Sequence, residues 1–318
     1  HFGEKHQPLT SNKFRRKSAT THEIYNMVKM EDTLDTLEAM LHQEGCGYVV
    51  PTFLGHLPQH TSFGESVDPQ ARASIAEWCY KIMTICHYTS DTAEIAVSCL
   101  DRFVSTRDGY ECLLDRPQFQ LAALAAVYTA VKVHEQQALT PALVAKLSNG
   151  AFAKEDIEEM ERRMLKALKW RINPPTTMDF VRLFLSLIPD DVLDLNSRSV
   201  ILELSQYQVD RSIIEYDLCT RKASSVAFAS LLNSIESIFT DGMMGSYVES
   251  LISHYANIDS YSVQGLRDRL YEAISNHPEA ATILQARQAK RSSSTPTYRF
   301  NMVKPAPKSP RSVFMSSQ

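Results

Sequence analysis

Two charged residues occur within apolar stretches, and this makes them the first candidates for chemistry. Arg72 lies near the start of the segment ARASIAEW, and Asp101 lies in CLDRF between Leu100 and Phe103. A charged side chain on a mainly apolar helix either faces water or pairs with an opposite charge, because an unpaired buried charge is very costly. The residues alone leave both alternatives open. The chemistry that they offer is an ion pair rather than catalysis.

Two further charges border apolar stretches. Lys132 ends the run FQLAALAAVYTAVK, so its ammonium must reach the surface of whatever core that run forms. Glu161 follows Met160 in a segment that is rich in lysine and glutamate. A carboxylate in such a segment more often faces solvent or a partner than serves as a general acid or base.

Signatures of enzymes and of metal sites are missing from the sequence. It holds no G-x-x-x-x-G-K-[ST], G-x-G-x-x-G, G-x-S-x-G or H-E-x-x-H pattern. None of the six cysteines forms a C-x-x-C pair, and no histidine pair has zinc-finger spacing. We therefore expect no catalytic residue, no cofactor, no metal and no disulfide.

Composition narrows the class of protein further. The 318 residues are 44% hydrophobic and carry a net charge of -4, which is ordinary for a globular protein and gives no field that favours nucleic acid. No apolar run reaches the roughly 20 residues that cross a bilayer. We expect neither nucleic acid nor a membrane as a partner.

The segment from Gln118 to Glu135 is the element around which the rest is organised. It is apolar or small at almost every position from Phe119 to Val131, and a helix that is apolar on all sides is buried. Its five alanines let neighbouring helices approach closely. The segment is predicted to be the central helix of a bundle.

Helical periodicity runs through most of the remaining sequence. Five segments precede Pro174-Pro175, at about 68–87, 90–107, 115–135, 140–150 and 154–170, and five follow it, at 177–188, 192–211, 222–239, 246–255 and 262–275. An earlier helix is expected at 24–43. The pattern predicts an all-α protein of two tandem five-helix bundles.

Four regions follow from this pattern. Residues 1–66 form an N-terminal arm, helix and loop, residues 67–175 the first bundle, and residues 176–278 the second. Residues 279–318 are expected to be a flexible tail, because the sequence there is basic and rich in serine and proline, and has no acidic residue from 290 onward.

Several strings together resemble the cyclin family. ARASIAEW is similar to the family's M-R-A-I-L-x-D-W, and TAEIAVSCLDRFVS resembles its second helix with the D-R-F signature. Residues 119–132 resemble its third helix, and Met160-Glu161 followed by LKALKW resembles its fifth. These strings occur in the family's order over residues 69–176. LEAMLHQEGCGYVVPTFL, together with Lys169-Trp170, resembles the D-type, G1-phase branch, although that branch's L-x-C-x-E motif is absent.

The resemblance implies two tandem cyclin folds and a function. Cyclins have no catalysis of their own; they bind and activate a cyclin-dependent Ser/Thr kinase and so control the cell cycle, in the nucleus and cytoplasm. It implies that Arg72 and Asp101 form an internal ion pair. The kinase-binding residues that it implies are Lys132, Glu161, Leu165, Trp170 and Ile172.

Departures from the family concern its peptide-docking patch and its kinase contact. The patch maps onto Ala71, Ser74, Ile75, Trp78, Lys81 and Gln120. The family's large apolar residues are here Ala71 and Ser74, and its acidic residue is Lys81, so we expect weak or absent docking of R-x-L peptides. The family's K-F-E-E is K-V-H-E here, which suggests a different choice of kinase.

Two proline-directed sites lie in the tail, at Thr295 and Ser309, with Arg299 and Arg311 nearby. A bound kinase would hold this tail at high local concentration. We expect phosphorylation there, with kinase substrates or inhibitors as further partners.

Other functions remain open at this point. One is a cyclin-fold transcription or nucleic-acid-binding factor, or a transcription-associated cyclin; another is a helical adaptor without a kinase. The near-neutral charge and the absence of cysteine pairs argue against a nucleic-acid factor.

Overall fold

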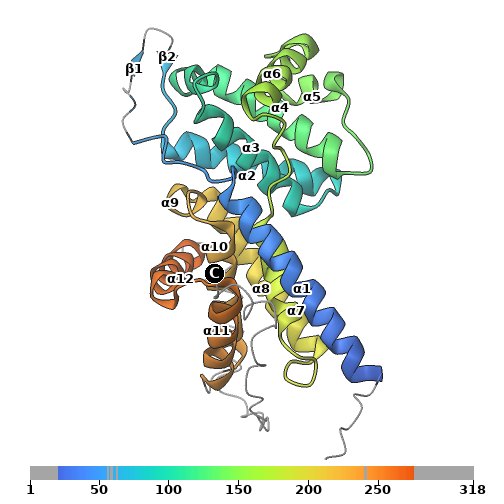
Figure 1. Cartoon of the computed structure of the whole chain (residues 1–318). Helices are drawn as coiled ribbons and strands as arrows, with labels where there is room; N and C mark the ends of the chain where they lie inside the picture. The colour runs from blue at the N-terminus through green and yellow to red at the C-terminus, as the bar shows by residue number, and fades with distance from the viewer. Residues whose placement is uncertain (1–20, 56, 58–59, 62–63, 240–241, 276–318) are drawn as a thin grey trace, which may run out of the picture.

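The computed structural model describes residues 21–55, 57, 60–61, 64–239 and 242–275, with side chains from residue 28 on and none at 60, 61 and 64. The described chain is all-α and forms two helical bundles in tandem, as the sequence predicted (Figure 1). The first holds α2 (Pro69–Cys86), α3 (Ser90–Val104), the 3₁₀ helix η1 (Tyr110–Leu114), α4 (Arg116–His134), α5 (Pro141–Leu147) and α6 (Lys154–Ala167). The second holds α7 (Thr177–Leu187), α8 (Leu195–Ile214), α9 (Tyr216–Cys219), α10 (Ala223–Ile238), α11 (Met243–Ala256) and α12 (Ser260–Ser275).

The central helix of the first bundle is α4, as predicted. Its residues from Leu121 to Val127 are all buried, and it packs against α3, α5, α6, η1 and α2. Alanine dominates this stretch, so the surrounding backbones can approach closely. Only Gln120, Tyr128 and Lys132 interrupt its burial between Phe119 and Lys132.

Helix starts follow the capping signals in the sequence. Asp68 accepts a hydrogen bond from Ala71 N at 2.6 Å, with Pro69 as the first residue of α2. Thr140 likewise accepts from Leu143 N, with Pro141 at the start of α5. Both helices begin where the sequence predicted a start, at a capping Asp or Thr that is followed by proline.

The second bundle is built around α10, which contacts α7, α8, α11 and α12. Phe180, Phe184 and Phe228 are fully buried in its core. Two short elements differ from the sequence prediction: the 3₁₀ turn η1 in the first bundle and the single turn α9 in the second. Neither is long enough to show a helical period.

A minimal hairpin lies in the loop before α2. Strands β1 (His60–Thr61) and β2 (Gly64–Glu65) pair antiparallel, with His60 opposite Glu65. Strands of two residues are too short to show an alternating pattern, so these strands could not be predicted from the sequence.

The N-terminal helix α1 (Thr21–Gly45) lies along the second bundle rather than the first, in contact with α7 and α11 (Figure 1). Glu44, near its end, is buried and accepts hydrogen bonds from Ser224 N at 2.9 Å and Ser224 Oγ at 2.7 Å. Since Ser224 lies in the first turn of α10, α1 supplies a carboxylate to the start of that helix.

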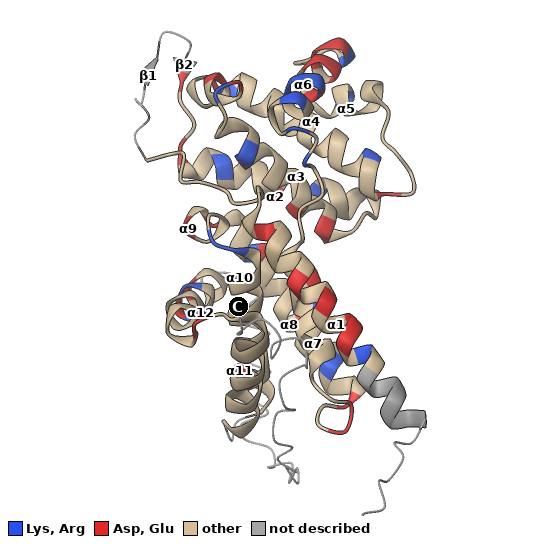
Figure 2. Ribbon diagram, viewed as in Figure 1, with Lys and Arg blue, Asp and Glu red and all other residues tan. Residues whose placement is uncertain are grey.

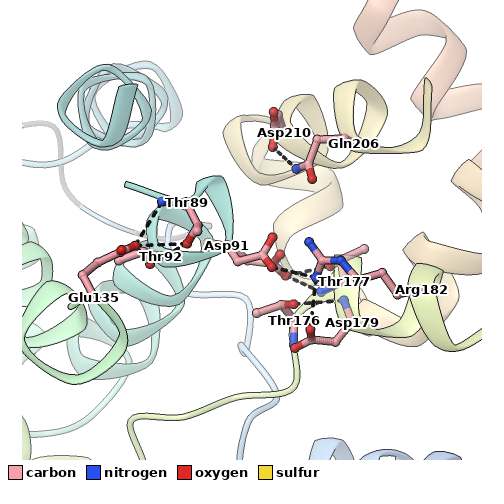
Figure 3. A network of polar contacts seen from close by, with 11 residues as sticks. Thr89, Asp91, Thr92, Glu135, Thr176, Thr177, Asp179, Arg182, Gln206 and Asp210 are labelled. Atoms are coloured by element: carbon pink, nitrogen blue, oxygen red, sulfur yellow. Dashed lines mark hydrogen bonds and ion pairs between the residues drawn. The ribbon is translucent and has the colours of Figure 1, made fainter. Parts of the chain in front are cut away.

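A polar network joins the two bundles where α3 meets α7 (Figure 3). Asp91 of α3 accepts from Arg182 Nη1 of α7 at 2.7 Å, and Arg182 also pairs with Asp179 at 3.1 Å. Asp210 of α8 lies close by, with Gln206 Nε2 donating to it at 2.8 Å. Helices α2 and α3 contact α8 beside this network. Ionic and apolar contacts together fix one bundle on the other.

None of the described helices combines the length and the apolar character that crossing a membrane requires.

Candidate functional site

Lys132 and Glu161 form an ion pair at the edge of the first bundle. Lys132 Nζ lies 2.5 Å from Glu161 Oε1, and Thr129 Oγ1 lies 3.2 Å from the same oxygen. Glu161 is only 9% exposed. The expectation that both charges lie at the surface is therefore wrong for Glu161: it faces α4 and is satisfied from within the chain.

The lysine remains accessible. Its side chain is 41% exposed, and its ammonium lies 4.8 Å from the centre of the Tyr128 ring. The negative face of an aromatic ring attracts a lysine ammonium through a cation–π interaction. The ammonium is thus fixed between a carboxylate and a ring, with one side left open to a partner.

The turn after α6 presents an exposed indole. The helix ends at Ala167, three residues before the predicted end, because Lys169 and Trp170 adopt left-handed φ angles of 52° and 61°. Trp170 N donates to Leu165 O at 2.9 Å, so the turn closes against the end of the helix. Consecutive left-handed residues other than glycine are strained, and such strain concentrates at functional sites.

The remaining residues of the expected interface divide by burial. The Trp170 residue is 72% exposed, whereas Leu165 is 8% exposed and therefore belongs to the core. Ile172 is half-buried. The apolar centre expected from Leu165, Trp170 and Ile172 is thus carried by Trp170, with Leu165 as its support. An exposed tryptophan of this size is typical of an interface anchor.

Glu135 has a structural partner at the end of α4. Its Oε1 accepts from Thr89 N at 3.0 Å, from Thr89 Oγ1 at 3.1 Å and from Thr92 Oγ1 at 2.5 Å (Figure 3). The carboxylate therefore ties the end of α4 to the start of α3. It holds in place the helix that carries Lys132.

The ion pair between Arg72 and Asp101 is present and buried. Arg72 Nη2 lies 2.6 Å from Asp101 Oδ2 and Nε lies 3.2 Å from Oδ1, and both residues are 1% exposed. Arg72 Nη1 donates to the carbonyls of Ile213 and Ile214 at the end of α8. The guanidinium thus joins α2, α3 and the second bundle, and its charge is fully compensated.

A groove of about 440 Å³ lies between α2, α4 and the end of α5. Five of the six expected docking-patch residues line it: Ala71, Ser74, Ile75, Trp78 and Gln120. Lys81 does not line it; it is exposed on the same helix, one turn after Trp78. Arg116 is the charged residue in the lining, and it pairs with Glu65 at 3.0 Å and Asp68 at 3.1 Å.

Within the described residues, no group of three histidine, cysteine, aspartate or glutamate side chains is placed to hold a metal. The described cysteines are all free thiols. The candidate phosphorylation sites Thr295 and Ser309 lie outside the described residues.

Sequence reasoning missed two buried carboxylates. Glu94 of α3 accepts from Thr177 N at 2.8 Å and Thr177 Oγ1 at 2.7 Å, and Glu44 caps α10 in the same way. Burial raises the pKa of Glu94 to about 8, against the lowering effect of the bonds from Thr177. A signal existed for Glu94, because it lies seven residues before Asp101 and therefore on the same apolar face of α3.

Comparison with known proteins agrees with this architecture. The family model of the cyclin N-terminal domain matches residues 49–173, and that of the cyclin C-terminal domain matches residues 175–305. A viral cyclin from herpesvirus saimiri shares the fold, with a TM-score of 0.56 at 19% identity over 76% of this chain and 97% of that chain.

The curated relatives are longer than this chain. A G2/mitotic-specific cyclin-B of Patella vulgata is 24% identical over 216 residues, which are 66% of this chain and 48% of that protein. Cyclin-A3-1 of Oryza sativa subsp. japonica is 26% identical over 166 residues, 52% of this chain and 42% of that protein. The chain thus spans about half the length of these relatives. They are A- and B-type cyclins, so the D-type resemblance stays a prediction.

Both bundles match cyclin domain models, in the expected order and with the boundary between the two matches at the double proline. The chain therefore belongs to the cyclin family.

Proposed function

We propose that this chain is a regulatory subunit that binds a cyclin-dependent Ser/Thr kinase and activates it to control the cell cycle. The observation that carries the proposal is the exposed indole of Trp170, at the end of the helix that also holds Glu161. An accessible lysine, Lys132, pairs with that glutamate from the neighbouring helix. The chain itself is proposed to contribute no catalytic residue.

The proposed mechanism is that this chain holds the C-helix of the kinase in its active position. Protein kinases are active only when a lysine of the β-sheet pairs with a glutamate of the mobile C-helix. A rigid surface that holds the C-helix inward completes that pair. Here rigidity comes from α4, which is packed on all sides and tied at its end by Glu135 to Thr89 and Thr92.

Trp170 supplies the apolar contact of this surface, and Lys132 supplies its charge. An indole that is 72% exposed loses most of its contact with water when a partner covers it. The ammonium of Lys132 donates to Glu161, and its open side is available to backbone carbonyls or a carboxylate of the kinase helix. Ile172 is half-buried and extends the apolar contact.

The cell-cycle phase and the compartment belong to the same proposal. The segment from Leu37 to Leu54 favours a D-type, G1-like role, and we propose that the complex acts in the nucleus and cytoplasm. Replacement of the family's K-F-E-E by residues 132–135, K-V-H-E, favours a kinase whose contact differs there.

The test is affinity purification of the full chain from a cell extract, followed by identification of the bound proteins and by assay of Ser/Thr kinase activity on the beads. The proposal predicts a cyclin-dependent kinase whose activity is at least tenfold higher in the bound fraction than in the kinase alone. Recovery of nucleic acid and transcription factors without a kinase would contradict it and favour a cyclin-fold transcription factor.

A further inference from the structure

Arg102 of α3 is a buried cation whose charge no carboxylate of the described residues balances. It is only 5% exposed. Asp101, its neighbour in the sequence, pairs with Arg72 at 2.6 Å, and none of the described carboxylates forms an ion pair with Arg102. Its Nε–H is buried and has no hydrogen-bond partner among the described residues. A buried guanidinium without a counter-charge is costly, so its place in the structure needs a reason beyond the stability of the core.

The guanidinium of Arg102 contacts two segments that are far apart in the sequence. Nη2 donates to Arg171 O at 2.8 Å, on the residue that directly follows Trp170. Nη1 lies 3.5 Å from Gly47 O, just beyond the end of α1, and the guanidinium carbon lies 4.7 Å from the centre of the Tyr48 ring. Arg102 therefore lies between the turn that presents the exposed indole and the segment that follows α1.

The same two segments are also joined to each other directly. The side chain of Arg171 donates to Cys46 O, and Gln43 Nε2 donates to Asn173 O at 3.0 Å. The end of α1 and the turn after α6 thus form one unit. Arg102 is the buried side chain that ties this unit to α3.

Trp170 needs such support because its backbone is strained. Lys169 and Trp170 have φ angles of 52° and 61°, which residues other than glycine rarely adopt. Trp170 N donates to Leu165 O at 2.9 Å, and this bond holds the turn onto its own helix. The bond from Arg102 to Arg171 O fixes the turn to α3 as well. The direction of the exposed indole therefore depends on a side chain from another helix.

We infer that Arg102 is a positioning residue of the kinase-binding surface: it fixes the direction of the Trp170 indole by holding the following peptide group to α3 and to the end of α1. Its role in binding rests on the proposed function, whereas the fixed position of the indole is a property of this chain alone. An anchor that is already held in place loses less conformational entropy when a partner covers it. Lysine cannot replace this arginine, because a single ammonium lacks the planar fork that reaches both carbonyls and the ring.

The first measurement needs no kinase. Trp78 and Trp170 are the two tryptophans of the chain, so Trp78→Phe leaves Trp170 as the only indole. Time-resolved fluorescence anisotropy then reports how freely this indole moves on the nanosecond timescale. Adding Arg102→Lys is expected to raise the share of anisotropy that is lost through fast local motion by about twofold or more. An unchanged share would overturn the inference.

The second measurement is a double-mutant cycle on kinase binding. The kinase recovered with the wild type is titrated against Arg102→Lys, Trp170→Ala and the double variant. Arg102→Lys is expected to weaken binding roughly five- to twentyfold. Because Arg102 acts through Trp170, the double variant should bind about as weakly as Trp170→Ala alone. Two effects that multiply in full would show that Arg102 does not act through the indole, and would overturn the inference.

Arg198 of α8 provides the matched control. Its guanidinium is also largely buried and also donates to backbone carbonyls, to Leu193 O at 3.0 Å and to Leu185 O at 2.5 Å, but in the second bundle. Arg198→Lys should lower the melting temperature to a similar degree as Arg102→Lys. It should leave the anisotropy decay of Trp170 and the affinity for the kinase as in the wild type. An equal change in both variants would assign the effect to a general loosening of the fold and contradict the role of Arg102.

Tyr48→Leu is the second variant, used where Arg102→Lys does not fold. It removes the ring that faces the guanidinium and keeps an apolar side chain, so the fast share of the Trp170 anisotropy decay should rise here too. Absence of that rise would overturn the inference in the same way. Failure of the wild type to bind any kinase would contradict the proposed function, while the anisotropy decays would still decide whether Arg102 positions the indole.

Discussion

Glu94 of α3, in the first bundle, binds Thr177, the first residue of α7 in the second bundle. Glu94 Oε1 accepts hydrogen bonds from the amide and the hydroxyl of Thr177, at 2.8 and 2.7 Å. Two more carboxylates lie near it, Asp91 and Asp179, and both pair with Arg182 (Figure 3). The charges of the described residues are otherwise spread over both bundles (Figure 2). The junction between the bundles therefore gathers acidic groups around the buried Glu94, with Asp91 and Asp179 partly exposed beside it.

Stability of the junction should depend on pH through Glu94. Burial raises the pKa of Glu94 from its ordinary 4.5 to about 8, with Asp91 and Asp179 adding to the rise, so the folded state binds the proton more tightly than the unfolded state. The corresponding stability is complete below about pH 4.5 and is lost as the pH rises toward 8. Glu94→Gln keeps an acceptor oxygen for Thr177 but cannot ionise. The free energy of unfolding of Glu94→Gln, relative to that of the wild type, should therefore increase between pH 5 and 8, by up to about 1.4 kcal/mol per pH unit.

The measurement is urea unfolding of both proteins at pH 5, 6.5 and 8. Asp210→Asn is a second case, because burial raises the pKa of Asp210 to about 6; its difference from the wild type should grow only up to that pH. Parallel curves for wild type and Glu94→Gln across this range would show that Glu94 is ionised throughout.

Removing either member of the buried pair Arg72–Asp101 should destabilise the chain strongly. Each variant, Arg72→Ala or Asp101→Ala, leaves an unpaired charge in the interior, which costs roughly 3–5 kcal/mol. Arg72 also loses its bonds to Ile213 and Ile214, so its loss should weaken the contact between the bundles.

Denaturant unfolding measures this effect. Arg162→Ala is the matched control, because Arg162 pairs with Glu159 on the exposed face of α6, where a pair contributes about 0–1 kcal/mol. A loss below 1 kcal/mol for both Arg72→Ala and Asp101→Ala would contradict the role given to the pair.

Phosphorylation of the tail is expected once the proposed kinase is bound. Thr295 and Ser309 precede prolines in a basic segment, and a bound kinase sees them at high local concentration. Each phosphate adds about -1.5 to -2 charges. Mass spectrometry of the active complex should find both sites modified at a rate independent of dilution, whereas a complex with an inactive kinase should leave them unmodified. Unmodified sites in the active complex would rule this expectation out.

Long apolar segments made the fold predictable from the sequence. The run of alanines and large apolar residues from 119 to 131 has no stable place except a core, and α4 occupies it. Asp68 before Pro69 and Thr140 before Pro141 located two helix starts by local chemistry alone. The short turns α9 and η1 escaped prediction because they contain too few residues to show a period.

The candidate site was less predictable, because burial of a charge depends on distant residues. Glu161 was expected at the surface, yet it is buried. Its carboxylate accepts hydrogen bonds from Thr129 and Lys132, which lie about thirty residues earlier in the sequence. Glu44 meets Ser224, 180 residues away in the sequence. No local pattern encodes such partners. The left-handed pair Lys169-Trp170 likewise depends on how the chain leaves α6, and neither residue type signals it.

The kinase-binding role rests most directly on Trp170, and one binding measurement tests it. The kinase recovered with the wild type would be titrated against wild type, Trp170→Ala and Tyr261→Ala, each first checked by thermal melting. Tyr261 is the control because it is 90% exposed on α12, far along the chain from the proposed surface. Truncating an anchor of this kind costs about 2–4 kcal/mol of binding. The account predicts that Trp170→Ala melts like the wild type and binds the kinase at least thirtyfold more weakly, while Tyr261→Ala binds normally. Equal affinity of Trp170→Ala and wild type would contradict it.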